Sequence, residues 1–503
     1  MREEEKARNH KQRNREGAIP VRTFETDVQQ LKYNVLKQVA ERAYDGHLME
    51  SYYEIPKVIS PGPKATMRCC VYKERAIVQE RVRLAMGGDR RNPNVIEVIP
   101  IACDECPVER YTVSPSCRGC ISHRCIKACP KKAITKEGSG RAQINEDLCI
   151  ECGRCAKACP YGAITENVRP CERSCKVGAV KMNEDKKASI NIDKCIACGA
   201  CAYACPFGAI MDKSFMVDAI NIIKNKKKGD GYDYKVVAIV APALASQFEK
   251  ATVGQLATAM KQLGFDYITE AAMGADMVAK KETEELAEKG YLTSSCCPAF
   301  VSYIRKHVPE LSEKISHNLS PMAEIGRFIK LNAEIPVKTV FIGPCTAKKQ
   351  EMQLPSVDLW IDCVLTFEEL QAMLDARGID ETTLEETPVD DASYFGRIFG
   401  RSGGLTEAVQ QVVKEQSFDV EVKPEICDGI EACKVALLKA KVGKLDKNFI
   451  EGMACVGGCA GGAASLTHEP KSRMKVDNYG KATDKAGVLD SVEKYQEKVQ
   501  TIR

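Results

Sequence analysis

The cysteines between residues 103 and 205 constrain the fold of this chain more than any other feature of its sequence. This stretch holds sixteen of the 26 cysteines, and two runs within it have the spacing C-x2-C-x2-C-x3-C-P. Each run places three thiolates in one short loop, which suits three irons of a [4Fe-4S] cluster, and its fourth cysteine binds the neighbouring cluster. A zinc site needs only two C-x-x-C pairs. The sequence therefore predicts iron–sulfur clusters on two complete runs: Cys149, Cys152, Cys155 and Cys159, then Cys195, Cys198, Cys201 and Cys205.

A third run has the same pattern with its middle gap widened to four residues: Cys117, Cys120, Cys125 and Cys129. Exchange of the fourth ligands combines it with the run that begins at Cys149 into a two-cluster ferredoxin unit. We therefore predict two clusters here, one on Cys117, Cys120, Cys125 and Cys159, and one on Cys149, Cys152, Cys155 and Cys129.

The second unit is degenerate. By the same exchange, the run Cys195, Cys198 and Cys201 requires Cys175 as its fourth ligand. The cysteines then left over are Cys103, Cys106, Cys171 and Cys205. Four clusters need sixteen thiolates, which is the number present, although the spacing of this last set matches no standard run. We expect three to four accessory [4Fe-4S] clusters that together form an electron relay.

Several classes of protein are disfavoured by the remaining composition. Disulfide-rich proteins are usually small and secreted, whereas the N-terminal MREEEKARNHKQRNREG lacks the apolar core of a signal peptide. No apolar run approaches the ~18 residues that span a bilayer. The net charge of +4 gives no argument for nucleic acid or a membrane surface. We expect a cytoplasmic protein with no nucleic-acid partner and no membrane partner.

The region before the cysteine runs, residues 1–100, predicts helices over 23–46 and 65–88, separated by Pro-Gly-Pro at 61–63. Cys69 and Cys70 fall in the second helix, where we predict buried thiols. Residues 101–223 form the ferredoxin-like region, and the lysine- and glycine-rich segment 224–234 predicts a boundary after it.

Residues 234–503 predict an α/β domain. The continuous apolar runs 234–245 and 338–345 suit buried parallel strands. Amphipathic helix patterns occupy 253–265 and 366–378. Alternation of such strands and helices favours a largely parallel sheet.

Three short segments of this domain carry cysteines in distinctive contexts: SSCCPAF, GPCTAKKQE and EGMACVGGCAGG. The glycines beside these cysteines allow backbone N–H groups to approach a cofactor closely. Cys297, Cys345, Cys455 and Cys459 supply the four thiolates that a further cube requires.

These three segments resemble the signature loops of the [FeFe]-hydrogenases, which bind the H-cluster. That cofactor is a [4Fe-4S] cube joined through a cysteine sulfur to a two-iron site with CO, cyanide and a bridging dithiolate. The resemblance implies an α/β catalytic domain of two lobes, with mixed or parallel sheets around the H-cluster. To this it adds an α+β ferredoxin-like domain and a helical N-terminal segment.

The implied activity is reversible hydrogen chemistry in anaerobic metabolism, 2H⁺ + 2e⁻ ⇌ H₂. The implied partners are ferredoxin or a similar electron carrier, H₂ and protons, and the hydrogenase maturation proteins.

Carried over by position, the resemblance gives the cube ligands as Cys297, Cys345, Cys455 and Cys459, of which Cys459 bridges to the two-iron site. Cys296 would be a free thiol that passes a proton to the cofactor amine, since a thiol can give and take a proton near neutral pH. Lys348 matches the lysine that contacts an iron-bound cyanide. The remaining residues predicted to contact the cofactor are Pro344, Met453, Ala243 and Ser295.

The proton path of the family runs through a glutamate, a serine and a second glutamate, which correspond here to Glu282, Ser316 and Glu285. On the sequence alone, the two glutamates are also typical of an exposed, charged helix. Departures at Gly343, Ala243, Phe300 and the GGAAS end of the last loop resemble the branch often called group B.

Two alternatives stay open. One is a non-catalytic iron–sulfur assembly protein that keeps the cube without the two-iron site. The other is an H₂ sensor, which usually carries a signalling domain, whereas only 44 residues follow Cys459. Cys296, Lys348 and Met453 favour the enzyme, because a plain cube needs none of them.

Overall fold

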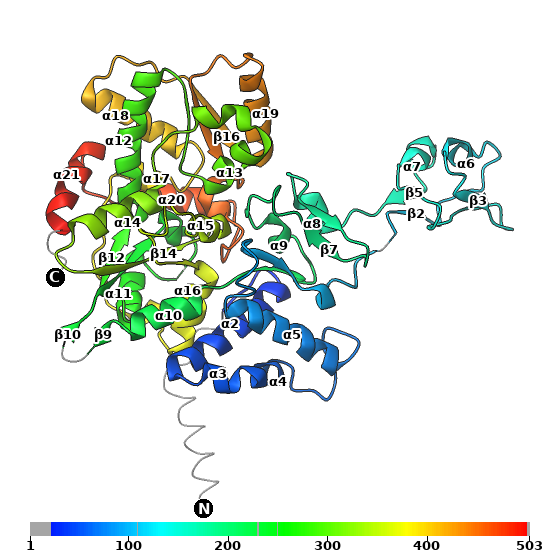
Figure 1. Ribbon diagram of the computed structural model, residues 1–503, viewed down its shortest axis with the longest axis horizontal. Helices are drawn as coiled ribbons and strands as arrows, with labels where there is room; N and C mark the ends of the chain where they lie inside the picture. Colours follow the sequence, from blue (N-terminus) through cyan, green and yellow to red (C-terminus); the bar gives the residue numbers. More distant parts are fainter. Residues whose placement is uncertain (1–21, 108, 229–230, 249, 500–503) are drawn as a thin grey trace, which may run out of the picture.

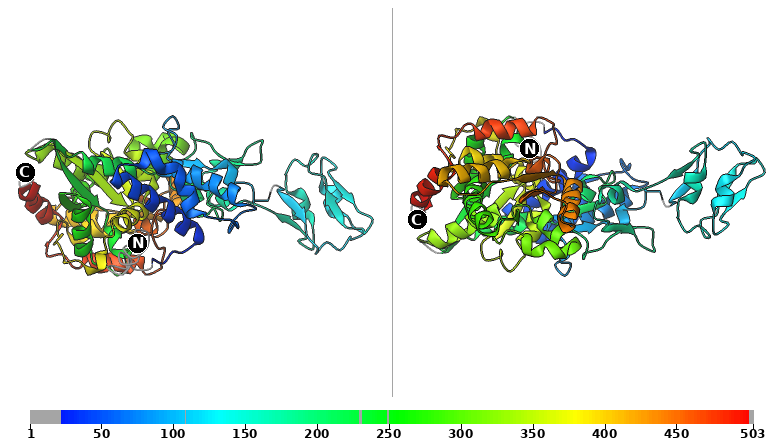
Figure 2. Two further views of the ribbon diagram at one scale, coloured as in Figure 1. Left: turned by 90° about the horizontal axis from the view of Figure 1, so that it is seen from below. Right: turned by 90° about the horizontal axis from the view of Figure 1, so that it is seen from above.

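The computed structural model describes residues 22–107, 109–228, 231–248 and 250–499. Figure 1 shows an α/β body that contains the second half of the chain, with the N-terminal helices packed against its lower side. The cysteine-rich region extends from the body and ends in a lobe that stands apart in every view (Figures 1 and 2). No helix in the described part of the chain is long and apolar enough to cross a membrane.

The N-terminal region is helical, as predicted, with α2 (Asp27–Asp45), α3 (Leu48–Ser51), α4 (Ile55–Ile59) and α5 (Val71–Ala85). Thr26 caps the first turn of α2 by accepting the N–H of Gln29, and Gly46 ends it at φ 80°, a left-handed conformation that glycine adopts readily. The apolar face of α2 packs against α5 and against α16 (Phe367–Ala376) of the body.

The second predicted helix begins later than expected, at Val71. The carboxylate of Glu74 accepts the backbone N–H groups of Thr66 at 2.7 Å and Arg68 at 2.9 Å, and also that of Met67. Residues 66–68 therefore form a turn instead of the first helical turn. Cys69 and Cys70 lie in this non-helical segment and are exposed, so the prediction of buried thiols is wrong.

The cysteine-rich region consists of two similar units of short antiparallel strand pairs. In the outer unit, β2 (Tyr111–Val113) pairs with β5 (Ile164–Glu166), and β3 (Ile134–Lys136) pairs with β4 (Ala142–Ile144). In the inner unit, β1 (Ile96–Val98) pairs with β8 (Ile210–Asp212), and β6 (Val180–Met182) pairs with β7 (Ala188–Ile190). One-turn helices complete the outer and inner units: α6 (Arg124–Ala128), α7 (Arg154–Ala158), α8 (Pro170–Ser174) and α9 (Ala200–Tyr203).

The α/β body contains two parallel sheets, which confirms the predicted class. The first has the order β12-β11-β14-β15, from Tyr267–Glu270, Lys235–Val240, Val337–Gly343 and Cys363–Thr366. Its two central strands coincide with the apolar runs predicted as strands, and Val240 pairs with Ile342. The second sheet has the order β13-β17-β16, from Leu292–Thr293, Phe449–Met453 and Pro424–Asp428.

Helices cover both sheets. The predicted helices correspond to α11 (Val253–Leu263) and α16, and each begins with a capping box, at Thr252 and Thr366 respectively. The segment predicted as a boundary follows α10 (Met216–Lys224) and includes the short strands β9 (Lys227–Lys228) and β10 (Gly231–Tyr232). The other helices are α12 (Ala271–Lys289), α13 (Pro298–His307), α14 (Pro321–Asn332), α15 (Thr346–Glu351), α17 (Tyr394–Ile398), α18 (Gly404–Gln416), α19 (Ile430–Lys441), α20 (Ser472–Gly480) and α21 (Val488–Val499).

A buried network of charges joins the three regions of the chain. Lys349 on α15 is fully buried and forms ion pairs of 2.7 Å with Asp212 of the inner cysteine unit and with Glu369 on α16. Lys32 on α2 binds the other oxygen of Asp212 at 2.7 Å and also contacts Glu368. Although burial opposes it, the two lysines hold the pKa of Asp212 well below its usual range. Such pairing offsets the cost of removing these charges from water.

Candidate functional site

The three cysteine loops of the body meet at the carboxyl ends of strands from both sheets. SSCC follows β13, Pro344 and Cys345 follow β14, and the segment with Cys455 and Cys459 follows β17. Parallel strands present their carboxyl ends at one edge of a sheet, which is where ligand crevices form in α/β proteins. The loops enclose a cavity of about 90 Å³ with an almost entirely apolar lining.

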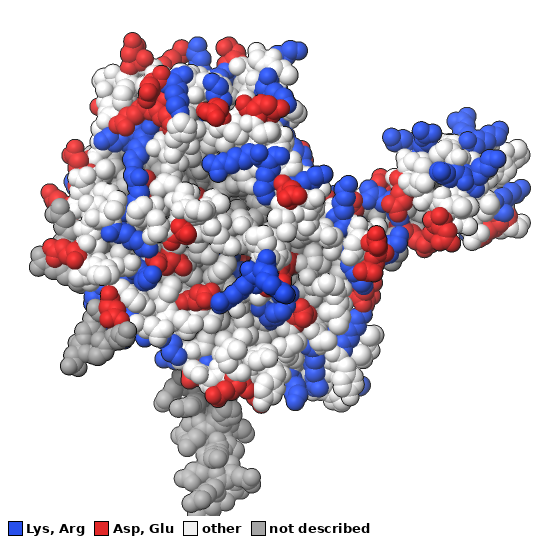
Figure 3. Space-filling model, in the orientation of Figure 1, with Lys and Arg blue, Asp and Glu red and all other residues white. Residues whose placement is uncertain are grey.

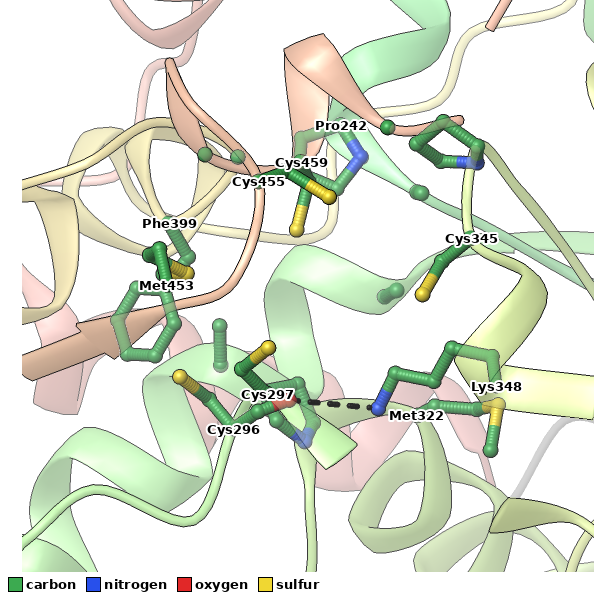
Figure 4. A pocket seen from close by; sticks show the side chains of 18 of the residues that line it. Pro242, Cys296, Cys297, Met322, Cys345, Lys348, Phe399, Met453, Cys455 and Cys459 are labelled. Carbon is green, nitrogen blue, oxygen red and sulfur yellow. Dashed lines mark hydrogen bonds between the residues drawn. The ribbon is translucent and has the colours of Figure 1, made fainter. Parts of the chain in front are cut away.

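Four thiols surround this cavity. Figure 4 shows the side chains of Cys297, Cys345, Cys455 and Cys459 arranged around it, from three separate loops. Burial raises the pKa of Cys345 to about 12 and that of Cys459 to about 11, and it raises the pKa of Cys455 well above its ordinary value. A coordinated metal deprotonates a thiol outright, so the donor set fits a thiolate-bound cluster.

A single metal ion fits this donor set less well. Within the residues that the structure describes, no group of three or more His, Cys, Asp or Glu side chains lies close enough for one ion. The cavity is instead ringed by four thiols that surround a common space, which suits a cube whose four irons each take one cysteine.

Cys296 lines the same cavity as its neighbour but has a different environment. It is 9% exposed, and Figure 4 shows its sulfur on the side of the cavity near Met453 and Phe399. Burial raises the pKa of Cys296 well above its ordinary value, and the nearby carboxylate of Glu282 adds to the rise. Cys296 is therefore a protonated thiol that can donate.

Lys348 brings a buried cation to the cavity. Its Nζ donates to Glu351 Oε2 at 2.8 Å and to the carbonyl oxygen of Cys296 at 3.4 Å, the bond drawn in Figure 4. Burial opposes the charge, but Glu351 outweighs it and raises the pKa of Lys348. The sequence analysis missed Glu351, although its spacing of three residues from Lys348 on one helix was a usable signal.

The cavity wall agrees with part of the predicted cofactor contacts. Pro344 and Met453 line the cavity, whereas Ala243 and Ser295 do not. Ala243 is fully buried behind Pro242, which takes the lining position. Ser295 is turned toward Glu282, to which it donates from both N and Oγ at 2.9 Å.

Sequence reasoning also missed part of the wall. Met322 and Phe399 line the cavity from α14 and from the residue after α17, and both are labelled in Figure 4. Their sequence contexts contain no cysteine and no motif, and only the tertiary fold brings them to the site.

Glu282, Ser316 and Glu285 lie near one another, and Glu282 is close enough to Cys296 to affect its pKa, while Glu282 Oε2 is buried without a hydrogen-bond partner. Glu282 is fully buried, which rules out the exposed-helix interpretation for this residue, and burial raises its pKa to about 7. Ser316 Oγ donates to Glu285 Oε2 at 3.0 Å, and the same hydroxyl offsets part of the rise at Glu282.

Glu285 is the member of this group of three residues that lies farthest along the predicted proton path from Cys296. Burial works against its ionisation, but Lys289, whose Nζ donates at 2.6 Å, and the N–H of His317 lower the pKa of Glu285. Ser295, Ser316 and His317 line a second cavity of about 510 Å³, whose wall also includes residues of the inner cysteine unit.

The relay cysteines of the outer lobe are grouped as the exchange rule predicts for one set. Burial is the main cause of the raised pKa of Cys125, and the nearby thiols of Cys159 and Cys120 add to it. Cys155 is similarly affected by burial and by Cys149 and Cys152.

The inner unit holds two further groups of thiols. Burial and the neighbouring thiols Cys198, Cys195 and Cys175 raise the pKa of Cys201 well above its ordinary value. Burial and the thiols of Cys205, Cys103 and Cys106 raise the pKa of Cys171 to about 11. The structure therefore brings together the residual set as well, although its spacing matches no standard run.

One cysteine set of the inner unit adjoins the cavity. Burial raises the pKa of both Cys198 and Cys455, and nearby thiols add to the rise: Cys297 at Cys198, and Cys198 at Cys455. The contact is tight: a Cβ added to Gly199 would lie 2.7 Å from Thr346 Oγ1, and this hydroxyl donates to Ala197 O at 2.7 Å. Gly199 is therefore required here for close packing as well as for its φ of 77°.

Comparison with known proteins finds similarity to two different families along the chain. Residues 234–463 match a family described as iron only hydrogenase large subunit, C-terminal domain, and residues 142–165 and 188–211 match a 4Fe-4S binding domain. Iron hydrogenase 1 of Clostridium pasteurianum is 31% identical over 271 residues, which cover 44% of this chain and 47% of the relative. The chain thus spans about half the length of that relative.

Two further relatives represent different kinds of protein. The periplasmic [Fe] hydrogenase large subunit of Nitratidesulfovibrio vulgaris is 29% identical, with 47% of this chain and 70% of the relative covered. Cytosolic iron-sulfur assembly component 3 of Mus musculus is 24% identical, with 48% and 64% covered. A solved structure of HydA(deltaEFG), which concerns stepwise H-cluster assembly, gives a TM-score of 0.47 at 22% identity, with 56% of this chain and 92% of that chain covered.

Proposed function

We propose that the chain is an [FeFe]-hydrogenase-like protein, to whose C-terminal domain family residues 234–463 are similar, and that it catalyses 2H⁺ + 2e⁻ ⇌ H₂ at an H-cluster. The observation that carries this proposal is the cavity, which gathers four thiols together with Cys296, Lys348 and Met453. A binding site for a plain cube needs the four thiols alone. The other three side chains supply a proton donor, a fixed cation and a polarisable wall, which suit a second, reactive metal group.

Cys297, Cys345, Cys455 and Cys459 would hold the H-cluster, and Lys348 would bind an anionic ligand of its two-iron part. That cofactor supplies the site at which protons and electrons combine. The chain itself provides the apolar lining, which excludes bulk water and strengthens the attraction between Lys348 and an anion.

Protons would travel between Cys296 and solvent along Glu282, Ser316 and Glu285. The two glutamates have pKa values displaced in opposite directions: that of Glu282 is raised to about 7, and that of Glu285 is lowered. A carboxyl group with a pKa near 7 can both accept and release a proton at neutral pH. Glu285, whose pKa is lowered, stays ionised and can collect protons from the cavity that Ser316 and His317 line.

Electrons would enter at the outer lobe and reach the cavity through the cluster on the cysteine set that contains Cys198. The carrier we propose is a small acidic redox protein such as ferredoxin. Residues 114–163 carry nine exposed Lys and Arg against four Asp and Glu. Figure 3 shows the basic side chains gathered over the upper and outer part of this lobe, with acidic ones along its lower edge.

A non-catalytic role in iron–sulfur assembly is the second candidate, since relatives described as cytosolic iron–sulfur assembly proteins align with about half of the chain. Infrared spectroscopy separates the two functions. Full-length protein produced with the hydrogenase maturation proteins should show CO and cyanide bands and evolve H₂ from reduced methyl viologen. A protein with full cube content but neither bands nor turnover would overturn the enzymatic proposal.

A further inference from the structure

Three arginines surround the residual cysteine set, Cys103, Cys106, Cys171 and Cys205. The closest is Arg169, which is 4% exposed. Its Nη1 lies 3.5 Å from Cys103 Sγ and its Nη2 donates to Lys186 O at 2.7 Å, while its Nε is buried without a hydrogen-bond partner. A buried guanidinium usually faces a carboxylate or another anion, whereas the side chain that Arg169 contacts here is the thiol of Cys103.

Arg81 is a second buried arginine near this set, close to Cys205. It is 2% exposed, its Nη2 donates to Phe207 O at 3.1 Å, and its Nε is also buried without a partner. Burial lowers the pKa of Arg81 to about 10, and Cys205 works against this shift. In the described part of the chain, neither Arg81 nor Arg169 forms an ion pair with a carboxylate.

Arg68 completes the group from the turn before α5. Its side chain is 7% exposed, and its Nη2 donates to Ala102 O at 3.2 Å, next to Cys103. Two acidic side chains, Asp104 and Glu105, lie 3.6 and 3.5 Å away. The arginines are close enough to affect a cysteine of the set: burial raises the pKa of Cys106, whereas Arg169 and Arg68 lower it.

The other three cysteine sets have different surroundings. In the described part of the chain, hydrogen bonds at their sulfurs join them to backbone N–H groups, as at Cys129, Cys159 and Cys175, and to the polar side chains of Ser122 and Asn94. The bond from Arg169 to Cys103 has no counterpart among them. A buried guanidinium therefore distinguishes this set.

We propose that Arg68, Arg81 and Arg169 form a cationic pocket for a fourth [4Fe-4S] cluster and give it the highest reduction potential of the accessory clusters. A cube with four thiolate ligands is an anion, and one-electron reduction adds a further negative charge. Nearby cations stabilise the reduced form more than the oxidised form, and they do so strongly where water is excluded. The electron comes from the carrier by way of the outer clusters and leaves to the inner one.

The position of this cysteine set gives the high reduction potential of its cluster a role in electron transfer. That role rests on the proposed hydrogen chemistry. Cys106 and Cys171 flank the outer lobe in sequence, and Cys171 also affects the pKa of Cys201 in the set that adjoins the cavity. The fourth cluster thus lies between the entry point and the site. A cluster that is reduced first stores one electron until the second arrives, and the reaction consumes two.

The test is a redox titration followed by electron paramagnetic resonance, on full-length protein reconstituted with iron and sulfide but without the two-iron group. Hydrogen turnover is not involved, so failure here is distinct from failure of the proposed function. The wild type should show one accessory cluster that is reduced before the rest, and Cys171→Ser should remove that component. Arg169→Gln and Arg81→Gln should each shift its reduction equilibrium at least tenfold toward the oxidised form, which is 59 mV for one electron.

Arg173→Gln is the matched control, because Arg173 lies on the same short helix as Cys171 but is exposed. It should leave all midpoints unchanged. Loss of about four irons confined to Arg169→Gln and Arg81→Gln would also support the cationic pocket. The proposal fails if the wild type contains only three accessory clusters, if all clusters titrate together, or if both arginine variants keep their iron and their midpoints.

Discussion

At the scale of single residues, adjacent positions in SSCCPAF face one cavity from different surroundings. Cys297 lies among three other thiols, whereas Cys296 lies beside Glu282, Met453 and Phe399. Successive side chains point in different directions, so two neighbours cannot easily serve one metal together. This difference leads to opposite expectations for the two alanine variants.

Cys297→Ala should lose the cofactor, because it removes one of four ligands. Cys296→Ala should keep the cofactor but lose turnover by about 10²–10⁴-fold, the usual contribution of a general acid–base group. Cys296→Asp should retain more activity than Cys296→Ala, because a carboxyl group can still carry protons. H₂ turnover and an infrared spectrum of each variant are the measurements. A Cys296→Ala protein that lacks the CO and cyanide bands, or that turns over at the wild-type rate, would contradict the proton-relay role.

The sequence indicated the four thiols around the cavity but only part of its wall. Cys297, Cys345, Cys455 and Cys459 could be identified because each lies in a short segment with recognisable neighbours. Met322 and Phe399 could not, since they reach the cavity from separate helical regions by tertiary packing. The burial of Glu282 was equally invisible, because α12 has charged residues on either side of this position and its neighbours in space come from other elements.

At the scale of elements, α12 is held by a buried carboxylate. Asp276 is fully buried and accepts hydrogen bonds from Ser393 N at 2.8 Å, Ser393 Oγ at 2.6 Å and Ser491 Oγ at 2.7 Å. It thereby joins α12 to the start of α17 and to α21. Burial raises the pKa of Asp276 to about 7, although the serine hydrogen bonds work against the rise.

This raised pKa predicts that stability falls as pH rises. Between the unfolded pKa of about 4 and the folded pKa of about 7, the unfolded chain binds fewer protons than the folded chain. The contribution of Asp276 to the free energy of unfolding therefore decreases by about 1.4 kcal/mol per pH unit across that window. Asp276→Asn, which stays neutral, should show a smaller loss of melting temperature from pH 5.5 to pH 8 than the wild type. Equal losses in both proteins would contradict the assignment.

The start of α5 shows where a local pattern is insufficient. Residues 65–70 belong to the segment predicted as a helix, yet the carboxylate of Glu74 accepts hydrogen bonds from the N–H groups of three of them. By contrast, both ends of α2 were predictable, because Thr26 and Gly46 are strong capping residues. Helix ends set by local caps can be read from sequence, whereas those set by competing side-chain bonds cannot.

At the scale of the whole molecule, the iron content gives the number of clusters in the proposed electron relay. Five cubes and one two-iron site correspond to about twenty-two irons per chain, and a value near eighteen would remove the cluster on Cys103, Cys106, Cys171 and Cys205. Cys205→Ser should damage that cluster while the infrared bands of the cavity persist, because Cys205 is not among the residues that line the cavity. Loss of the bands would show that Cys205 supports folding of the site instead.

The outer lobe provides the second test at this scale. Helices α6 and α7 carry equivalent basic residues, Arg124 and Lys127 on one and Arg154 and Lys157 on the other, and all four are exposed. The lobe stands apart from the body, so a carrier can reach it from several sides (Figures 1 and 2). A basic surface attracts an acidic carrier over a distance set by the ionic strength.

Reversal of two of these charges, in the double variant Lys127→Glu with Lys157→Glu, should slow electron exchange with an acidic ferredoxin at low salt by at least tenfold, within the 10–10³ range of electrostatic steering. Turnover with methyl viologen should not change, because a small cationic dye does not need this docking surface. The difference between wild type and variant should shrink as salt rises and screens the surface charges. The matched control reverses two exposed charges on the body, Lys439→Glu and Lys444→Glu. If this control slows ferredoxin exchange as much as the lobe variant does, or if the lobe variant behaves as wild type, the carrier binds elsewhere.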